Sequence, residues 1–163
     1  MKTLLIVFHS ATGGTWQMAE AAARGASAEP ELRVRLLRAS EAHADDVLGG
    51  DGYVFAAPEN LAAVAGVMKD FFDRTYYPVL DRINGRPYAV LVCAGSDGRN
   101  AVRQIERIAT GWRLRAVTDP LVVCTRAQTK EAILAPKVIG ADDLRRCEEV
   151  GAALGAGLVM GIF

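Results

Sequence analysis

Hydrophobic and polar positions divide the chain into short apolar runs and amphipathic segments. Unbroken apolar runs occur at residues 4–8, 53–57, 88–94 and 121–124, and such runs are typical of strands that are covered on both faces in a parallel sheet. Residues 32–37 instead alternate apolar and basic side chains, which predicts a strand with one wetter face at the edge of the sheet. The pattern therefore predicts five strands.

Helical periodicity occupies most of the chain between these strands. The expected helices cover residues 15–28, 62–74 and 100–110 and the segment from Asp142 onwards. Pro30 is expected to close the first of them, Pro58 to end the third strand, and Tyr76-Tyr77-Pro78 to end the second helix. Residues 128–139 are irregular, with room for one short helical turn.

Strands that alternate with helices predict an α/β fold, a three-layer, doubly wound, five-stranded parallel sheet of order 2-1-3-4-5. No linker and no internal repeat interrupts the pattern, so residues 1–163 are expected to form a single domain. In such a sheet ligands bind at the carboxyl ends of the strands, beside the switch between strands one and three. The loops at residues 9–15, 58–62 and 94–99 are expected to meet there.

The first of these loops has the chemistry of an anion site. Its sequence is Ser10-Ala11-Thr12-Gly13-Gly14-Thr15. The two glycines permit positive φ, the hydroxyl groups offer donors, and a helix that follows the loop would present free amides to an anion. The alternative is an ordinary strand-to-helix turn with Thr15 as the N-cap.

Two common phosphate-binding motifs are absent from the loop, which limits the anions that it could bind. No lysine lies between Lys2 and Lys69, so the triphosphate-binding pattern GxxxxGK[ST] is absent, and so is the dinucleotide pattern GxGxxG. A neutral loop rich in hydroxyl groups suits a terminal monophosphate.

Composition excludes several classes of protein. The net charge is zero, with 19 basic and 19 acidic residues, which gives no indication of binding to nucleic acid or an anionic membrane. Cys93, Cys124 and Cys147 are scattered and fit neither a disulfide framework nor a zinc site, so no metal is expected. No signal peptide is evident, and the apolar residues 150–163 fall short of the roughly 20 needed to span a bilayer. A cytoplasmic location is therefore expected.

The loop Ser10–Thr15 resembles the flavodoxin-like family, whose first loop has the form [ST]-x-T-G-x-T and holds the phosphate of FMN. The region around the end of the third strand resembles the flavin loop of NAD(P)H-dependent FMN reductases and quinone reductases. The resemblance implies that Pro58, Glu59, Asn60 and Leu61 border the isoalloxazine ring. It also implies that the third loop, Ala94-Gly95-Ser96-Asp97-Gly98, contacts the pyrimidine edge of the ring.

Two departures from flavodoxins favour a reductase over an electron carrier. The second and third loops contain no Trp, Tyr or Phe to cover the ring, and the chain is neutral where flavodoxins are strongly acidic. The resemblance then implies that NAD(P)H passes hydride to FMN and that a quinone or similar small acceptor collects the electrons. It implies no catalytic side chain, since the chemistry lies on the flavin, and it suggests a homodimer. A one-electron carrier and a flavin-free binding protein on the same fold are the alternatives.

Other reactive residue types have simpler interpretations. His9 is interpreted as a packing or hydrogen-bonding residue, and His43 as part of a solvated polar connection. Arg99 and Arg103 suit either the extra phosphate of NADPH or a solvated helix face.

Overall fold

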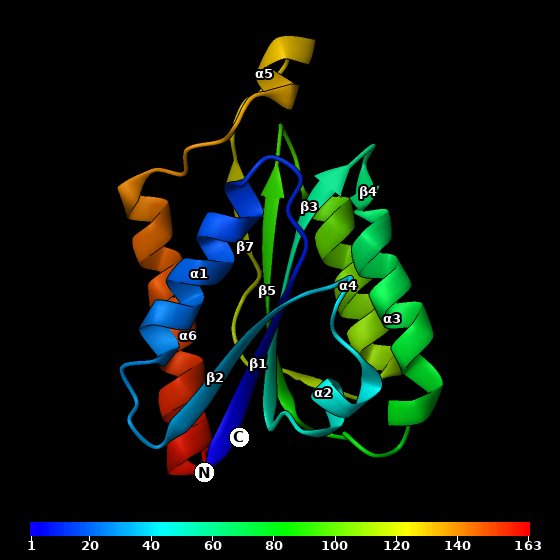
Figure 1. Cartoon of the computed structure of the whole chain (residues 1–163), viewed down its shortest axis with the longest axis vertical. Coiled ribbons are helices and arrows are strands. Elements are labelled where there is room, and N and C mark those ends of the chain that lie inside the picture. The colour runs from blue at the N-terminus through cyan, green and yellow to red at the C-terminus, as the bar shows by residue number, and fades with distance from the viewer.

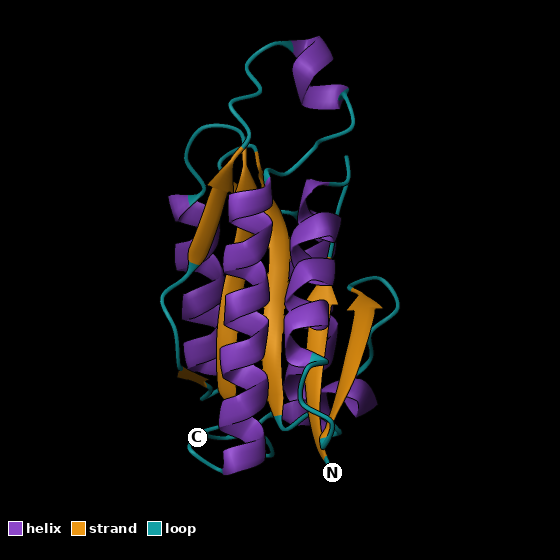
Figure 2. Cartoon of the chain, turned by 90° about the vertical axis from the view of Figure 1, so that its left-hand side faces the viewer, coloured by secondary structure: helices purple, strands orange, loops and turns teal.

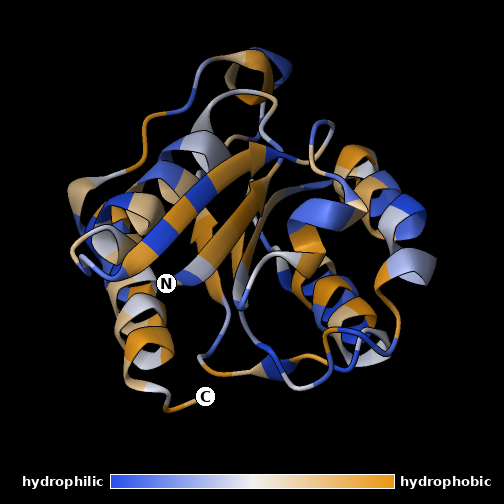
Figure 3. Cartoon of the chain, turned by 60° about the horizontal axis from the view of Figure 1, so that its bottom comes forward, coloured by the Kyte–Doolittle hydropathy of each residue, from blue (hydrophilic) through white to orange (hydrophobic).

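A mainly parallel sheet lies between two layers of helices in the computed structural model, which describes residues 1–163 (Figure 1). The strands are β1 Lys2–Phe8, β2 Leu32–Arg38, β3 Gly52–Asn60, β4 Ala63–Val64, β5 Pro87–Ala94, β6 Arg115–Ala116 and β7 Leu121–Cys124. The strand order is β2-β1-β3-β5-β6, β7 also pairs with β5, and β4 alone is antiparallel, paired with β3. The predicted fold class and strand order are confirmed, and β2 is the edge strand that its alternating pattern predicted (Figure 3).

Helices cover both faces of the sheet. They are α1 Gly14–Ala26, α2 Ala44–Leu48, α3 Gly66–Val79, α4 Arg99–Gly111, α5 Lys130–Leu134 and α6 Ala141–Met160. The helices α1 and α6 pack on one face, and α2, α3 and α4 on the other (Figure 1). The short helix α5 stands apart, beyond the carboxyl ends of the strands (Figure 2).

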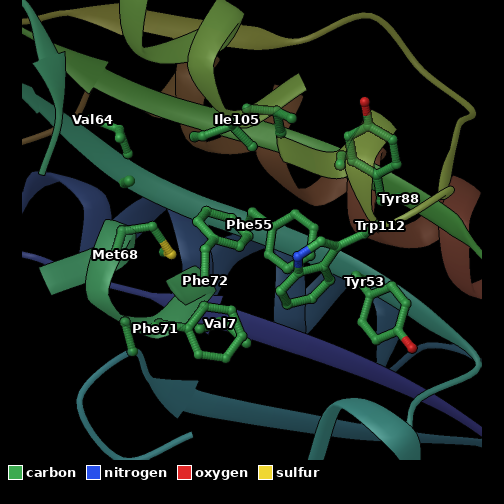
Figure 4. Close-up of a cluster of buried hydrophobic side chains, with 14 of the residues drawn as sticks. Val7, Tyr53, Phe55, Val64, Met68, Phe71, Phe72, Tyr88, Ile105 and Trp112 are labelled. Atoms are coloured by element: carbon green, nitrogen blue, oxygen red, sulfur yellow. The ribbon is translucent and has the colours of Figure 1, made fainter. Parts of the chain in front are cut away.

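The two faces of the sheet have cores of different character. On the α3 and α4 face, rings from Phe55, Phe71, Phe72 and Trp112 pack against one another (Figure 4). On the other face, small residues bring α1 and α6 together, and a Cβ at Gly151 would overlap the carbonyl group of Ala22. The sheet that carries the loops is therefore fixed from both sides.

The sheet has seven strands where five were expected. The expected fifth strand is split into β6 and β7 around Asp119-Pro120, since proline offers no N–H to a neighbouring strand. The strand β4 forms a hairpin with β3, so the helix expected from residue 62 begins only at Gly66. Leu61 and Ala62 form the turn, with φ of 49° and 61°, values typical of Asn or Gly in tight hairpins.

The expected end of the third strand at Pro58 is also wrong, because β3 continues to Asn60. Backbone groups alternate sides along a strand, and the carbonyl of Ala56 accepts the N–H of His9 on the β1 side. The backbone of Pro58 faces the same side, beyond the end of β1 at Phe8, so its missing N–H removes no bond to β1. Its carbonyl accepts the N–H of Ala65 at 3.2 Å. Pro78 likewise lies inside the last turn of α3, which ends at Val79.

Candidate functional site

Three loops meet at the carboxyl ends of β1, β3 and β5 (Figure 1). They are loop one (residues 9–15), loop two (residues 58–62) and loop three (residues 94–99). Loop one lies against β5, since a Cβ at Gly14 would come within 2.7 Å of the sulfur of Cys93. The structure therefore brings together the three segments that the sequence predicted.

Loop one ends at a helix whose first amides are free. Gly13 is the N-cap of α1, with a φ of 94°, and its N–H donates to Ser10 Oγ at 3.1 Å. Thr15 is therefore not the N-cap. The amides of Gly14, Thr15 and Trp16 have no acceptor within the helix and donate to no other protein group. Three aligned donors thus remain available at the positive end of α1.

The hydroxyl group of Thr15 is a further donor without a protein partner. Thr15 is only 2% exposed, and its hydroxyl forms no hydrogen bond within the protein. No fully buried side-chain oxygen or nitrogen lacks a partner, so the Thr15 oxygen must occupy the small part of the residue that reaches solvent. A ligand at the N-terminus of α1 would find this hydroxyl beside the free amides.

Gln17 fastens loop one to the segment that follows β7. Its Nε2 donates to the carbonyls of Gly13 and Lys137 at 2.9 and 2.7 Å, and its Oε1 accepts the N–H of Ile139 at 3.0 Å. The N–H of Lys137 donates to the carbonyl of Thr12 at 2.8 Å. Sequence reasoning missed Gln17, since nothing local links it to residues 137–139.

Glu59 fastens loop two to loop three. Its carboxylate accepts the N–H of Gly98 at 3.0 Å and that of Ala101 at 3.1 Å, at the N-terminus of α4. The negative charge of this carboxylate also interacts favourably with the positive end of the α4 dipole. Glu59 was predicted to border the flavin ring, and the structure adds that its side chain holds the two loops together.

The β3–β4 hairpin is anchored to α4 by two further hydrogen bonds. Asn100 Nδ2 donates to the carbonyl of Ala62 at 2.5 Å, and Gln104 Oε1 accepts the N–H of Val64 at 2.8 Å. At the tip of the hairpin, the side chain of Leu61 is fully exposed. The hairpin therefore presents an apolar side chain on a fixed backbone.

Charged side chains near loop three pair with their neighbours. Arg99 Nε donates to Asp97 Oδ1 at 2.6 Å, and this hydrogen bond lowers the pKa of Asp97. Arg103 donates to Asn100 Oδ1 at 2.8 Å. Both arginines lie on the exposed face of α4, and the choice between a solvated face and the extra phosphate of NADPH stays open.

Two titratable groups near loop one, the imidazole of His9 and the thiol of Cys93, are neutral. Burial, and secondarily the charge of Arg38, lower the pKa of His9, so its imidazole is uncharged at neutral pH. Burial raises the pKa of the Cys93 thiol to about 11, so it stays protonated. Neither group is poised as a nucleophile or an acid.

Two cavities of about 510 and 450 Å³ lie outside loop one. The first is lined by side chains of β4, α3 and α4, and the second lies at the amino end of the sheet beside Met1 and Pro30. We call the free amides of Gly14, Thr15 and Trp16 the amide cradle. No helix of the protein is both long and apolar enough to cross a bilayer. The cytoplasmic location and the homodimer stay predictions.

The fold and the amide cradle define a flavodoxin-like α/β protein. The family model for NADPH-dependent FMN reductases matches residues 39–129, more than half of the chain. The chain therefore belongs to the NADPH-dependent FMN reductase family, which confirms the resemblance predicted from the sequence. Loops two and three lie inside the matched region and loop one lies outside it, so the assignments of individual site residues stay predictions.

Curated relatives include a flavodoxin and a quinone dehydrogenase. The chain is 35% identical over 96 residues to a flavodoxin of Aquifex aeolicus, covering 59% of this chain and 50% of that protein. It is 33% identical over 95 residues to an NAD(P)H dehydrogenase (quinone) of Acidithiobacillus ferrooxidans, covering 46% of this chain and 48% of that protein. The chain thus spans about half the length of the curated relatives it matches.

Solved structures confirm the fold. A flavodoxin from the domain Archaea has a TM-score of 0.78 at 16% identity, covering 96% of this chain and 99% of that chain. A WrbA-like flavodoxin of Agrobacterium tumefaciens has a TM-score of 0.70 at 18% identity, covering 98% of this chain and 99% of that chain. At such low identity the likeness extends to the fold alone.

Proposed function

We propose that this chain binds FMN and catalyses its reduction by NAD(P)H, with a quinone or similar small molecule as the final acceptor. The observation that carries the proposal is the set of free amides at the N-terminus of α1, beside loops two and three, in a chain of the NADPH-dependent FMN reductase family.

Loop one is proposed to hold the phosphate of FMN. The amides of Gly14, Thr15 and Trp16 and the Thr15 hydroxyl supply four donors that no protein group uses. Ser10 and Thr12 hydroxyl groups lie in the same loop, and Ser10 Oγ can still donate while it accepts the Gly13 N–H. A phosphate at this position also meets the positive end of the helix dipole.

Loops two and three are proposed to hold the isoalloxazine ring. The amides of Leu61 and Ala62 donate to no protein acceptor, and neither do those of Gly95, Ser96 and Asp97. These groups can therefore donate to the polar edge of the ring without breaking a protein hydrogen bond. Gly98 is excluded as a donor, since its N–H already binds Glu59.

The protein's part in the reaction is positioning. Bound FMN supplies the hydride acceptor and the redox chemistry. Loops two and three contain no aromatic side chain, so one face of the ring is left open for the nicotinamide and then for the acceptor. The quinone is supported by the relative from Acidithiobacillus ferrooxidans, whose name includes it.

The test is anaerobic addition of NADPH, and separately NADH, to protein that has been incubated with FMN and freed of unbound flavin. The proposal predicts loss of the visible flavin absorption, followed by its return when a soluble quinone is added. Retained flavin that dithionite reduces and neither nicotinamide reduces would indicate the alternative function, a one-electron carrier. No retained flavin would overturn both redox functions.

A further inference from the structure

Loop one has no cationic side chain of its own. Residues 9–15 contain neither Lys nor Arg, while a phosphate monoester carries a charge of about −1.5 to −2 at neutral pH. Two cationic residues flank the loop, Arg38 on the β2 side and Lys137 in the segment that follows β7. The two side chains differ in the hydrogen bonds that they already form within the protein.

Lys137 is fully engaged within the protein. Its ammonium group donates to the carbonyls of Ala132, Ile133 and Ala135 at 2.8, 2.8 and 2.6 Å. An ammonium group has three donors, so none remains for a ligand. Lys137 therefore stabilises the C-terminus of α5.

Arg38 is free and lies beside the first turn of α1. It pairs in register with Phe8, the residue before loop one, and its guanidinium lies 5.3 Å from the centroid of the Phe8 ring. The ring of Trp16 lies 5.0 Å from that same ring. Arg38 forms neither an ion pair nor a side-chain hydrogen bond, and the residue is exposed. The guanidinium thus lies on the α1 side of the sheet, near a helix end whose Trp16 amide is free.

We propose that Arg38 supplies the positive charge that binds the phosphate of the flavin and so makes the site select FMN over unphosphorylated riboflavin. The inference rests on the proposed function, which places that phosphate at loop one. A guanidinium pairs with phosphate through two parallel N–H donors, so a swing of the exposed side chain from Phe8 toward the cradle exchanges a ring contact for charge-assisted hydrogen bonds. The unpaired Thr15 hydroxyl, in a residue only 2% exposed, marks the same cradle independently.

The experiment measures dissociation constants for FMN and for riboflavin by flavin fluorescence, in the full chain and in Arg38→Gln, Arg38→Lys and Arg33→Gln. The proposal predicts that Arg38→Gln weakens FMN binding about tenfold, the loss of one charge-assisted contact, and leaves riboflavin binding unchanged. Arg38→Lys should restore part of the loss. Added salt should weaken FMN binding to the unaltered chain more than to Arg38→Gln.

Arg33 is the matched control. It lies on the same strand, five residues nearer the amino end, pairs in register with Thr3, and also forms no ion pair. Arg33→Gln should bind both flavins as the unaltered chain does. Equal FMN affinities in Arg38→Gln and the unaltered chain would overturn the inference and leave the proposed function standing, and so would an equal loss for both flavins. Failure of the unaltered chain to bind FMN would instead overturn the proposed function.

Discussion

Two helices of this protein begin in the same way and differ in what fills their N-termini. Both α1 and α4 follow a central strand and begin after a left-handed glycine, Gly13 with a φ of 94° and Gly98 with a φ of 85°. At α4 the carboxylate of Glu59 accepts two of the first amides. At α1 no protein group accepts those of Gly14, Thr15 and Trp16.

The difference supports the proposal that α1, and not α4, receives an external anion. The same backbone geometry is satisfied by an internal carboxylate in one place and left open in the other, so the geometry alone does not require a ligand. The amides at α1 have no protein acceptor, so an anion can bind them without displacing a protein group. Alterations at α1 should therefore change ligand binding, and alterations at Glu59 should change stability.

The largest expected effect is on FMN binding when loop one is blocked. In the double variant Thr12→Gln and Thr15→Leu, bulky side chains replace the two hydroxyl donors and fill the cradle. The dissociation constant for FMN, measured by fluorescence titration, should rise about 100-fold or more. The change Thr110→Leu, on the exposed face of α4, should have no effect, and an unchanged affinity in the double variant would remove the phosphate assignment.

The next largest effect is expected on stability, when the carboxylate of Glu59 is removed from the N-terminus of α4. Glu59→Ala leaves the amides of Gly98 and Ala101 without their charged acceptor, so the free energy of unfolding should fall by about 2 kcal/mol in urea denaturation. The exposed residue Glu149 forms no ion pair, and Glu149→Ala should leave stability unchanged.

Glu59→Ala also makes α4 resemble α1. Added sulfate should then raise the melting temperature of this variant more than that of the unaltered chain, since a new open N-terminus becomes available. An unchanged urea midpoint in Glu59→Ala would contradict the assigned difference between the two helices.

A smaller effect of opposite sign is expected at the β3–β4 hairpin. Leu61 and Ala62 both adopt positive φ, which strains residues that carry a Cβ. Replacing the pair by Asn-Gly, the preferred sequence for such turns, should stabilise the protein by about 1–2 kcal/mol in urea denaturation. A loss of stability would show that the turn is not built as described.

The smallest effect is the pH dependence contributed by His9. Because its pKa is lowered in the folded protein, the folded state binds a proton less readily than the unfolded chain does. The resulting stability is complete above the unfolded pKa of about 6.5 and is lost as the pH falls through the folded pKa. His9→Gln should therefore reduce the loss of stability between about pH 7 and pH 5 in urea titrations, and an unchanged pH dependence in this variant would contradict the assignment to His9.

Loop one was predictable because its determinants are adjacent in the sequence. Six consecutive residues carry the glycines and hydroxyl groups, and an apolar run and a helix-forming segment flank them. The unbroken apolar runs similarly predicted four buried strands and their order along the chain. The sequence was therefore sufficient to predict the features that depend on residues adjacent in the chain.

The rest depends on contacts between distant residues. The carboxylate of Glu59 accepts the N–H of Gly98, and the side chain of Gln17 accepts the N–H of Ile139. In each pair the two residues are far apart in the sequence, and no local pattern marks the contact. The hairpin was missed because Leu61-Ala62 contains none of the residues that usually mark such a turn. The role of Glu59 and the extra strand could therefore be seen only in three dimensions.

A crystal structure of the full chain soaked with FMN tests the central claim most directly. The account predicts phosphate oxygens within hydrogen-bonding distance, about 2.7–3.1 Å, of the amides of Gly14, Thr15 and Trp16 and of the Thr15 hydroxyl. A flavin bound with its phosphate elsewhere, and those amides still open, would contradict it.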